Sequence, residues 1–493
     1  MEYPSNVLMV SAECVPFAKT GGLGDVTGAL PGFLKKAGLD ARIIIPLYSF
    51  IDKERYGIKL AFEGVKISQG GETFICDIYE TLTQNEVPVY FLDYRPFFER
   101  ENIYHDSEFN DYHDNPKRFM FLSRAAPELC RLLNFKPDII HVNDWHTSIL
   151  PAWLKRLFNN DPLFSSTASV LTIHNIAYQG RYAGYYYGFT GLGEEDFTSD
   201  KFECFNAINL LKGGIHFADM VNTVSKGYAA ETRTPEGGHG LDHYLNKRGD
   251  EYVGILNGVD YSEWNPESDT LIPASYSSGD MNGKGLCKSV LQREFGLNHD
   301  PAVPVIGIVG RLVEQKGFYL LAGCIEDILN NFNVQFVILG SGDKQLETYF
   351  GTLPVQFPGR VGSYIGYSNE KAHLIEAGSD FFLMPSLFEP CGLNQIYSLK
   401  YGTLPIVRAT GGLDDTVENY NQNTGDGTGF KFREPLCKAI YDVVKIALLT
   451  YFNRKHHLIK LINNAMKQNF SWEDSAAEYI KLYSRALESR RAQ

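Results

Sequence analysis

A single carboxylate and a pair of glycines stand in two neighbouring loops late in the chain. Glu389 follows the apolar run Phe381–Met384, and Thr410-Gly411-Gly412 follows the run Leu404–Val407. Short apolar runs that end at a turn are typical of buried parallel strands, whose carboxyl ends bind ligands in open α/β sheets. Glycines there let backbone N–H groups approach an anion. The pattern predicts a sugar phosphate or sugar nucleotide as ligand; a surface glutamate beside two turn glycines is the alternative.

Two cations stand at another expected strand-to-helix turn. Arg311 and Lys316 follow the strand-like run Val303–Gly310 and precede apolar residues at helical spacing from Leu320 to Leu329. A guanidinium and an ammonium group at such a turn can clamp a diphosphate. Two solvated side chains on a surface loop are the competing interpretation.

A third such turn lies near the N-terminus. The strand-like run Asn6–Ser11 leads to the loop Lys19–Asp25, which contains a lysine and three glycines, and a helical pattern from Val26 to Ala37 follows. A dinucleotide fingerprint would need a third glycine where Thr27 stands, so a dehydrogenase is weakly supported. A cation beside three glycines suits an anionic ligand.

Polar side chains also follow two further expected strands. Asp144 and His146 come after Asp138–Asn143, and His174 comes after Val170–Ile173. Residues just past strand ends gather at one edge of a parallel sheet. A hydrogen-bonded structural role remains the alternative for any single histidine, but the group favours a site.

The strand and helix patterns start again after a turn-rich stretch, 265–280, so we place the domain boundary at 256/257. The predicted fold class is α/β, with two doubly wound domains whose glycine-bearing loops face a shared cleft. The predicted segments are 1–256, 257–471 and 472–493, the last beginning with an amphipathic helix, Trp472–Leu487, that crosses back to the first domain.

Composition excludes several classes of protein. The chain has 493 residues, 44% hydrophobic and 21% charged, as is ordinary for a soluble globular protein of at least two domains. A net charge of −13 disfavours nucleic acid and anionic membranes as partners. The eight cysteines form no CxxC pair and indicate reduced thiols. The start lacks a signal-peptide pattern and no apolar run could span a membrane, so we expect a cytoplasmic protein.

The motifs together resemble the bacterial glycogen synthases and plant starch synthases. Lys19–Val26 resembles their Lys-x-Gly-Gly-Leu-x-Asp-Val signature, and Phe388–Leu393 and Thr410–Leu413 resemble their carboxyl-domain motifs. Four further segments fit in the same order: His141–His146, Thr172–Asn175, Asn257–Asp260 and Arg311–Gly317. The resemblance covers essentially the whole chain.

The resemblance implies a GT-B fold, which is two Rossmann-like domains with the active site between them. It implies a retaining transferase that moves glucose from ADP-glucose, or with less support UDP-glucose, to the 4-hydroxyl at the non-reducing end of an α-1,4-glucan such as glycogen. No metal and no cofactor are expected, because protein cations would stabilise the departing diphosphate. The acceptor glucan would bind the first domain and the donor the second.

The resemblance also assigns roles to residues. The implied catalytic residues are His174, Glu389, Arg311, Lys316 and Asp144. His174 would lie over the reacting glucose, Asp144 and Asn257 would hold sugar hydroxyls, and Tyr367 would stack on the nucleotide base. The implied substrate-binding and nucleotide-binding residues are Lys19, Gly21, Gly22, Asp25, Asn257, Tyr367, Cys391, Gly392, Leu393, Thr410, Gly411 and Gly412. Thr410, Gly411 and Gly412 would supply N–H groups to the phosphates.

The sequence departs from related retaining transferases at one position. They carry a second glutamate eight residues after the first, where this chain has Tyr397. We therefore assign no second catalytic acid and favour a same-face attack over a double displacement. Two alternatives stay open: another GT-B glucan enzyme such as a phosphorylase, and a non-catalytic glucan-binding relative. The choice between ADP and UDP also stays open at this stage.

Overall fold

The computed structural model describes residues 3–108 and 110–492. Met1, Glu2 and Gln493, which belong to the predicted segments 1–256 and 472–493, lie outside the described residues, as does Phe109. The chain divides into two compact units. The first comprises 1–224, 229–257 and 472–493, and the second comprises 225–228 and 258–471.

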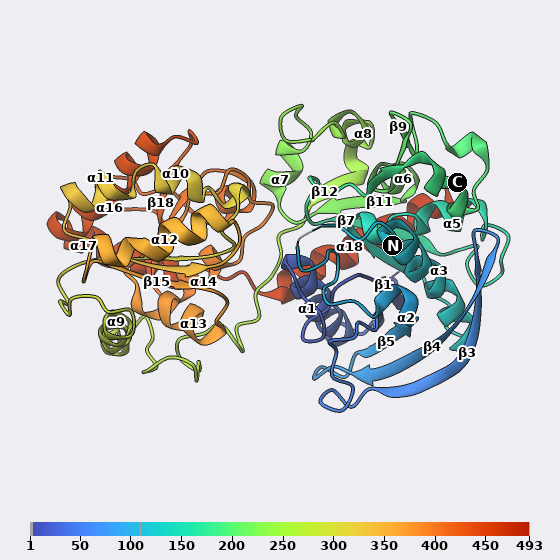
Figure 1. Ribbon diagram of the computed structural model, residues 1–493, viewed down its shortest axis with the longest axis horizontal. Helices are drawn as coiled ribbons and strands as arrows, with labels where there is room; N and C mark the ends of the chain where they lie inside the picture. The colour runs from blue at the N-terminus through green and yellow to red at the C-terminus, as the bar shows by residue number, and fades with distance from the viewer. Residues whose placement is uncertain (1–2, 109, 493) are drawn as a thin grey trace. The chain divides into compact units, whose positions relative to one another are not determined.

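The first unit is built on a nine-stranded sheet whose order is β12-β11-β7-β6-β1-β2-β5-β4-β3 (Figure 1). The strands from β12 to β5 are parallel, and the long hairpin β3–β4 is antiparallel. In sheet order the strands are β12 (Tyr252–Gly254), β11 (Met220–Thr223), β7 (Ala168–Ile173), β6 (Ile139–Asn143), β1 (Asn6–Val10), β2 (Asp40–Pro46), β5 (Pro88–Asp93), β4 (Glu72–Leu82) and β3 (Lys59–Gln69). The chain reverses its progression across the sheet at β1, which is where such folds bind ligands.

The helices of the first unit are α1 (Gly22–Lys36), α2 (Arg95–Phe98), α3 (Asn115–Leu132), α4 (Asp144–Thr147), α5 (Leu150–Arg156), α6 (Leu210–Phe217), α8 (Asp242–Lys247), α18 (Trp472–Arg491) and the short 3₁₀ helices η1 (Gly184–Thr190), η2 (Glu194–Asp196) and η3 (Gly249–Glu251). A small antiparallel sheet, β8 (Arg181–Ala183), β10 (Ala207–Asn209) and β9 (Glu203–Cys204), lies in the sequence between β7 and α6. Helix α7 (Lys226–Glu231) contains residues assigned to both units.

Helix α18 belongs to the first unit although the whole second unit precedes it in the sequence. It packs on α1 and on strands β6, β7 and β11. The Tyr483 hydroxyl lies 2.9 Å from Nδ1 of His141 on β6, and Asn222 on β11 donates to the Tyr479 hydroxyl at 3.2 Å. These buried polar contacts fix the helix to the middle of the sheet.

The second unit is built on a six-stranded sheet, all parallel, in the order β15-β14-β13-β16-β17-β18. The strands are β13 (Val305–Val309), β14 (Gln335–Gly340), β15 (Val361–Ile365), β16 (Phe381–Met384), β17 (Leu404–Arg408) and β18 (Phe430–Phe432). Alternate residues of strand β14 enter different apolar clusters: Phe336 and Ile338 join one, and Val337 and Leu339 join the other. Both faces of this sheet are therefore buried, as in doubly wound folds.

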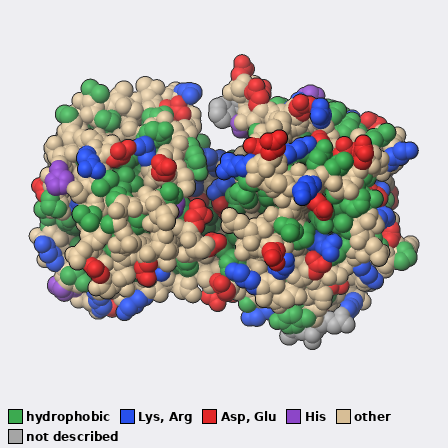
Figure 2. Space-filling view, turned by 90° about the horizontal axis from the view of Figure 1, so that it is seen from below, with side chains coloured by type: hydrophobic (Ala, Val, Ile, Leu, Met, Phe, Trp, Pro, Cys, Tyr) green, Lys and Arg blue, Asp and Glu red, His purple; other side chains and the backbone are tan. Residues whose placement is uncertain are grey.

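The helices of the second unit are α9 (Asn282–Glu294), η4 (Glu314–Lys316), α10 (Phe318–Ala322), α11 (Ile325–Asn331), α12 (Lys344–Gln356), α13 (Asn369–Gly378), α14 (Asn394–Lys400), α15 (Gly411–Thr416), α16 (Cys437–Asn453) and α17 (Lys455–Met466). None of the described helices of either unit is long and apolar enough to cross a membrane. Figure 2 shows basic and acidic side chains interspersed over the visible face of each unit.

Two predicted elements differ from the structure. Helix α1 begins at Gly22, so part of the predicted loop Lys19–Asp25 is already helical. The single helix predicted from Leu320 to Leu329 is two short helices, α10 and α11. They are separated at Gly323, a poor helix former, and Cys324, whose φ of −138° is not helical. The apolar spacing was correct for the buried face but could not reveal the break.

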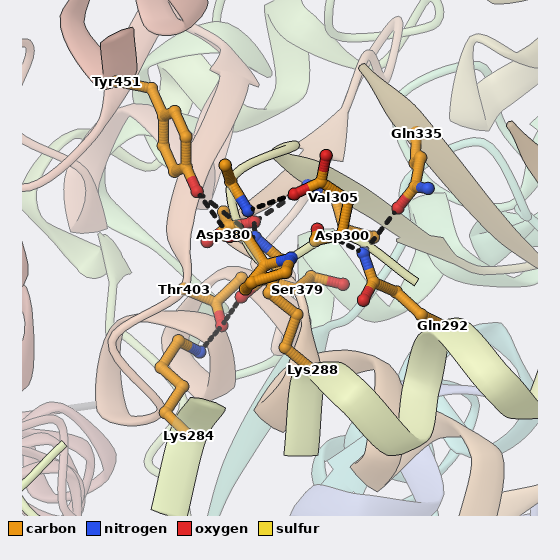
Figure 3. A network of polar contacts seen from close by, with 12 residues as sticks. Lys284, Lys288, Gln292, Asp300, Val305, Gln335, Ser379, Asp380, Thr403 and Tyr451 are labelled. Carbon is orange, nitrogen blue, oxygen red and sulfur yellow. Dashed lines mark hydrogen bonds and ion pairs between the residues drawn. The ribbon is translucent and has the colours of Figure 1, made fainter. Parts of the chain in front are cut away.

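A buried polar network closes the amino edge of the second sheet (Figure 3). The Asp380 carboxylate accepts the N–H of Val305 at 2.8 Å and forms an ion pair with Lys288, also at 2.8 Å. Lys288 additionally donates to the carbonyl oxygen of Pro301 and to the Tyr451 hydroxyl. The network joins the starts of β13 and β16 to α9 and α16.

Asp380→Ala is expected to lower the free energy of unfolding by about 3 kcal/mol, because it leaves a buried lysine without its counter-ion. This loss of stability is at the low end of the range for breaking a buried ion pair, because 20% of the Asp380 side chain is exposed. Urea unfolding followed by fluorescence measures it. The matched control, Lys438→Ala, breaks a pair whose side chains are 82% and 50% exposed and should cost less than about 0.5 kcal/mol. Equal effects of the two variants would contradict the assigned role of the network.

Candidate functional site

Lys316 and Glu389 come together at the carboxyl edge of the second sheet. Lys316 follows β13 and Glu389 follows β16, and these two strands are paired. Lys316 Nζ lies 2.6 Å from Glu389 Oε2, and the Ser386 hydroxyl donates to the same oxygen at 3.0 Å. The Glu389 side chain is 6% exposed and that of Lys316 is 23% exposed. A cation and an anion are thus held where electrostatic interactions are stronger than in water.

Gly317 fixes the position of Lys316. Its φ is 72°, and a Cβ at this residue would lie only 2.0 Å from the carbonyl oxygen of Pro385. The same two loops are also joined by a backbone hydrogen bond, in which the N–H of Leu387 donates to the carbonyl of Gln315 at 2.8 Å. Glycine is therefore required for the loop of Lys316 to touch the loop of Glu389.

The N–H groups of Thr410, Gly411 and Gly412 are those expected to meet phosphate, and two of them already have partners within the protein in this structure. The N–H of Gly412 donates to the carbonyl of Glu389 at 3.0 Å, and that of Thr410 donates to the carbonyl of Arg408 at 2.9 Å. Both donors are used inside the protein and are not available to a ligand in this structure.

Gly411 and Gly412 also have a packing role. A Cβ at Gly411 would lie 2.1 Å from the carbonyl oxygen of Glu389, and one at Gly412 would lie 2.1 Å from that of Cys391. The start of α15 therefore presses directly on the backbone that carries Glu389. The glycines hold the carboxylate in place through main-chain contact.

The other predicted residues of the second unit differ in exposure. Arg311 is exposed, and its guanidinium makes no hydrogen bond or ion pair with any described residue. Tyr367, which follows β15, is 84% exposed and presents an open ring. Cys391 is buried, and Gly392, at a φ of 72°, and Leu393 lead into α14.

Tyr397 on α14 belongs to an aromatic stack. Its ring lies parallel to that of Trp264, with centroids 4.0 Å apart and 3° between planes. The other face of Trp264 is covered by His373 at 3.7 Å. Tyr397, at the position where related transferases have a second acid, is therefore part of an aromatic stack and supplies no carboxylate.

Asp144 and His174 meet at the carboxyl edge of the first sheet, after the neighbouring strands β6 and β7. One carboxylate oxygen of Asp144 accepts the backbone N–H of His174 at 2.7 Å, and His174 Nε2 lies 2.9 Å from the side-chain oxygen of Asn143. Asp144 has a φ of 53°, which is rare for a residue other than glycine. Such a conformation persists only where its surroundings impose it, and it is common at functional sites.

Burial changes the protonation of both groups. It raises the pKa of Asp144 from 3.8 to about 7, although the N–H of His174 opposes the shift. It lowers the pKa of His174 to about 3. At neutral pH the imidazole is uncharged, so it can act through hydrogen bonds but not as a cation.

Lys19 and Asp25 form an ion pair, with 2.7 Å between Nζ and Oδ1 and side chains 48% and 26% exposed. Gly21 and Gly22 stand beside this pair. Neither has a positive φ, and a Cβ at either would meet no protein atom within 4 Å. Among the described residues no group demands glycine at these two positions, so the open space beside the backbone is available to a ligand.

Asn257 is 4% exposed, and its side-chain oxygen is buried without a hydrogen-bond partner among the described residues. Such an unpaired acceptor is costly unless a ligand satisfies it. His141, by contrast, does not belong to the site. Its two ring nitrogens contact Tyr483 and Thr172, so the motif His141–His146 contributes only its later residues.

Sequence reasoning missed Glu13, Tyr104 and Asn143 as members of this edge. Glu13 lies three residues after β1 and is 3% exposed, and Tyr104 donates to it from a distant loop. Its place just past a strand is the same signal that identified Asp144 and His174. The described residues contain no group of three or more histidine, cysteine, aspartate or glutamate side chains arranged to hold a metal ion.

Comparison with protein families gives two matches. Residues 6–247 match the starch synthase catalytic domain, and residues 292–468 match glycosyl transferases group 1. Among relatives, glycogen synthase 1 of Geobacter sulfurreducens is 50% identical over 488 residues, which is 98% of this chain and 97% of that protein. Glycogen synthase of Treponema denticola is 44% identical over 489 residues, covering 98% and 99%.

Solved structures agree with these matches. The catalytic domain of starch synthase IV from Arabidopsis thaliana, bound to ADP and acarbose, has a TM-score of 0.91 at 33% identity and covers 98% of this chain and 100% of its own. Sucrose-phosphate synthase from Thermosynechococcus elongatus shares the fold, with a TM-score of 0.61 at 17% identity and coverage of 97% and 98%. The predicted GT-B fold class is thereby confirmed.

Proposed function

Because the chain belongs to the family of bacterial glycogen synthases and starch synthases, we propose that it transfers glucose from ADP-glucose, with retention, to the 4-hydroxyl at the non-reducing end of an α-1,4-glucan. It is a glycosyltransferase that synthesises glycogen or starch from a nucleotide-sugar donor and a glucan acceptor. The choice of ADP, the retention and the residue roles are the parts that we propose.

In this proposal the second unit binds the donor. Transfer breaks the bond between the anomeric carbon of glucose and a phosphate oxygen, so negative charge develops on the departing diphosphate. Lys316 and Arg311 stabilise that charge, as preorganised cations do in a site of low dielectric. Glu389 orients Lys316 through the 2.6 Å ion pair.

The first unit binds the acceptor glucan and faces the transferred glucose. Neutral His174 donates or accepts hydrogen bonds at the glucose, and Asp144 and the unpaired Asn257 oxygen bind sugar hydroxyls. The new glycosidic bond forms on the face that the diphosphate leaves, and the diphosphate accepts the proton of the acceptor hydroxyl. No second carboxylate is needed for this path, in keeping with the stacked Tyr397.

The observation that carries the proposal is the Lys316–Glu389 pair at the ends of β13 and β16, where the strand order of the second sheet reverses. The choice of adenine is supported by the ADP in the related starch synthase IV structure. The exposed ring of Tyr367 offers a face on which a purine stacks more extensively than a pyrimidine.

The donor choice is tested by initial rates with ADP-glucose and UDP-glucose on the same glycogen primer. We expect kcat/KM to be at least about tenfold higher with ADP-glucose, because a difference of about 1.4 kcal/mol in stacking and edge contacts suffices. Tyr367→Ala should raise KM for the donor, whereas Tyr185→Ala, which removes another exposed ring, should not. Equal or faster transfer from UDP-glucose would reject ADP as the preferred nucleotide.

A further inference from the structure

Glu13 is a buried carboxylate that the proposed chemistry has not used. It lies between β1 and the loop of Lys19, and it is 3% exposed. Its carbonyl oxygen accepts the hydroxyls of Ser11 and Thr27, both fully buried. The backbone is therefore fixed, and the side chain extends from a rigid base.

The Glu13 carboxylate accepts four hydrogen bonds. Oε2 accepts the backbone N–H of Thr20 at 2.6 Å and that of Gly21 at 3.2 Å. Oε1 accepts the Thr20 hydroxyl at 2.7 Å and the Tyr104 hydroxyl at 2.5 Å. Two of these bonds hold the main chain next to Lys19 and Gly22, which is the part of the loop with open space beside it.

The hydrogen bond from Tyr104 links Glu13 to the residues of the same unit that we assign to sugar binding. The ring of Tyr104 stacks on His146, with centroids 4.8 Å apart and 25° between planes. His146 lies two residues after Asp144, whose carboxylate is electrostatically coupled to that of Glu13. The side chain of Tyr104 thus connects the loop that follows β1 with the loop that follows the neighbouring strand β6.

We propose that Glu13 is a positioning residue for glucosyl transfer: it holds the Thr20–Gly21 backbone, and thereby Lys19, in the arrangement needed for reaction. The inference rests on the proposed role of Lys19. Glu13 acts only as an acceptor of hydrogen bonds and takes no part in proton transfer. Its neutral analogue can preserve most of this function, since glutamine can accept both N–H bonds with its oxygen and donate its amide to the two hydroxyls.

Three variants at Glu13 test the proposal. Glu13→Ala is expected to lower kcat/KM for the donor roughly 10- to 100-fold, the size of effect produced by a misplaced loop. Glu13→Gln should stay within about tenfold of the parent. Should Glu13→Ala not fold, Glu13→Asp, whose carboxylate is one methylene short of the loop, takes its place.

A double-mutant cycle with Lys19→Ala separates positioning from general stability. If Glu13 acts through the loop of Lys19, its replacement should have little further effect on kcat/KM once Lys19 is removed. The matched control is Asp219→Ala. Asp219 is also a buried acid, accepting the N–H and hydroxyl of Ser169 and pairing with Lys155, but at the opposite edge of the sheet. It should lose stability and keep kcat/KM.

Three outcomes would overturn the proposal. A Glu13→Gln variant as inactive as Glu13→Ala would mean that the charge itself reacts, and multiplicative losses in the cycle would mean that Glu13 does not act through Lys19. A Lys19→Ala variant with parental activity would reject the proposed role of Lys19, and with it this route. Failure of the donor assignment is distinguishable, because it changes the preferred nucleotide and leaves the cycle intact.

Discussion

Lys316→Ala should lower kcat by about a hundredfold to a thousandfold, because a preorganised cation at a departing diphosphate contributes about 3–4 kcal/mol to the transition state. The side chain is only 23% exposed and sits against Glu389, so water cannot substitute fully for the lost charge. The measurement is the initial rate of glucose incorporation into glycogen at saturating donor. The KM for the donor should change much less than kcat, because the lost interaction strengthens as charge develops.

The control for this experiment is Lys344→Ala. Lys344 lies in the same unit and also pairs with a glutamate, but its side chain is 86% exposed, so activity should remain at the parental level. Circular dichroism must show both variants folded, because Lys316→Ala removes the counter-ion of the buried Glu389 carboxylate, which keeps its hydrogen bond from Ser386. A folded Lys316→Ala variant within tenfold of the parent would reject the assignment.

Asp144→Asn should lose activity and gain stability at the same time. Asparagine tolerates a positive φ better than most residues and keeps an oxygen for the His174 N–H, so the local backbone is preserved. We expect kcat to fall by up to about thirtyfold, because a hydrogen bond from a sugar hydroxyl to a carboxylate is stronger than one to an amide by up to about 2 kcal/mol.

The stability gain depends on pH with a definite sign. The pKa of Asp144 is raised from 3.8 to about 7 in the folded protein, so between these values the folded state keeps a proton that the unfolded chain has released. Raising pH through this window therefore destabilises the parent, and the full penalty is present above pH 7. Asparagine removes the penalty, so the variant should unfold at a higher temperature than the parent at pH 8.

The control is the same comparison at pH 4. There the parent carboxyl is protonated in the folded state, and the difference in melting temperature between parent and Asp144→Asn should largely vanish. A variant that is less stable than the parent at pH 8, or a stability difference independent of pH, would show that burial does not penalise the Asp144 charge as described.

Much of the site could be predicted from where polar residues fall relative to strands. Glu389, Lys316, Asp144 and His174 each follow a short apolar run, and each of the two sheets brings its own parallel strand ends to one of its edges. The same rule applied to Glu13 would have found it. Its partner Tyr104 could not be found in this way, because it lies 91 positions away in a loop with no regular pattern.

The glycines show a different limit of sequence reasoning. Gly411 and Gly412 look the same in the sequence whether the group that approaches them is a phosphate or a protein carbonyl, and in the structure it is a carbonyl. At Gly21 and Gly22, by contrast, no atom of the described residues lies within 4 Å of where a Cβ would be. Only the structure distinguishes a glycine that packs against a protein carbonyl from one that faces open space, because the sequence does not say which group lies next to the glycine.

The return of α18 to the first unit has a consequence for the order in which the chain folds during synthesis. On the ribosome, residues 258–471 emerge before α18 does, so the second unit can complete its core while the first still lacks one helix. Until then, the surface of β6, β7 and β11 that α18 covers, with His141 and Asn222, faces solvent. The nascent first unit therefore leaves this surface uncovered until α18 arrives, and transiently exposed surface of this kind makes folding intermediates prone to aggregation.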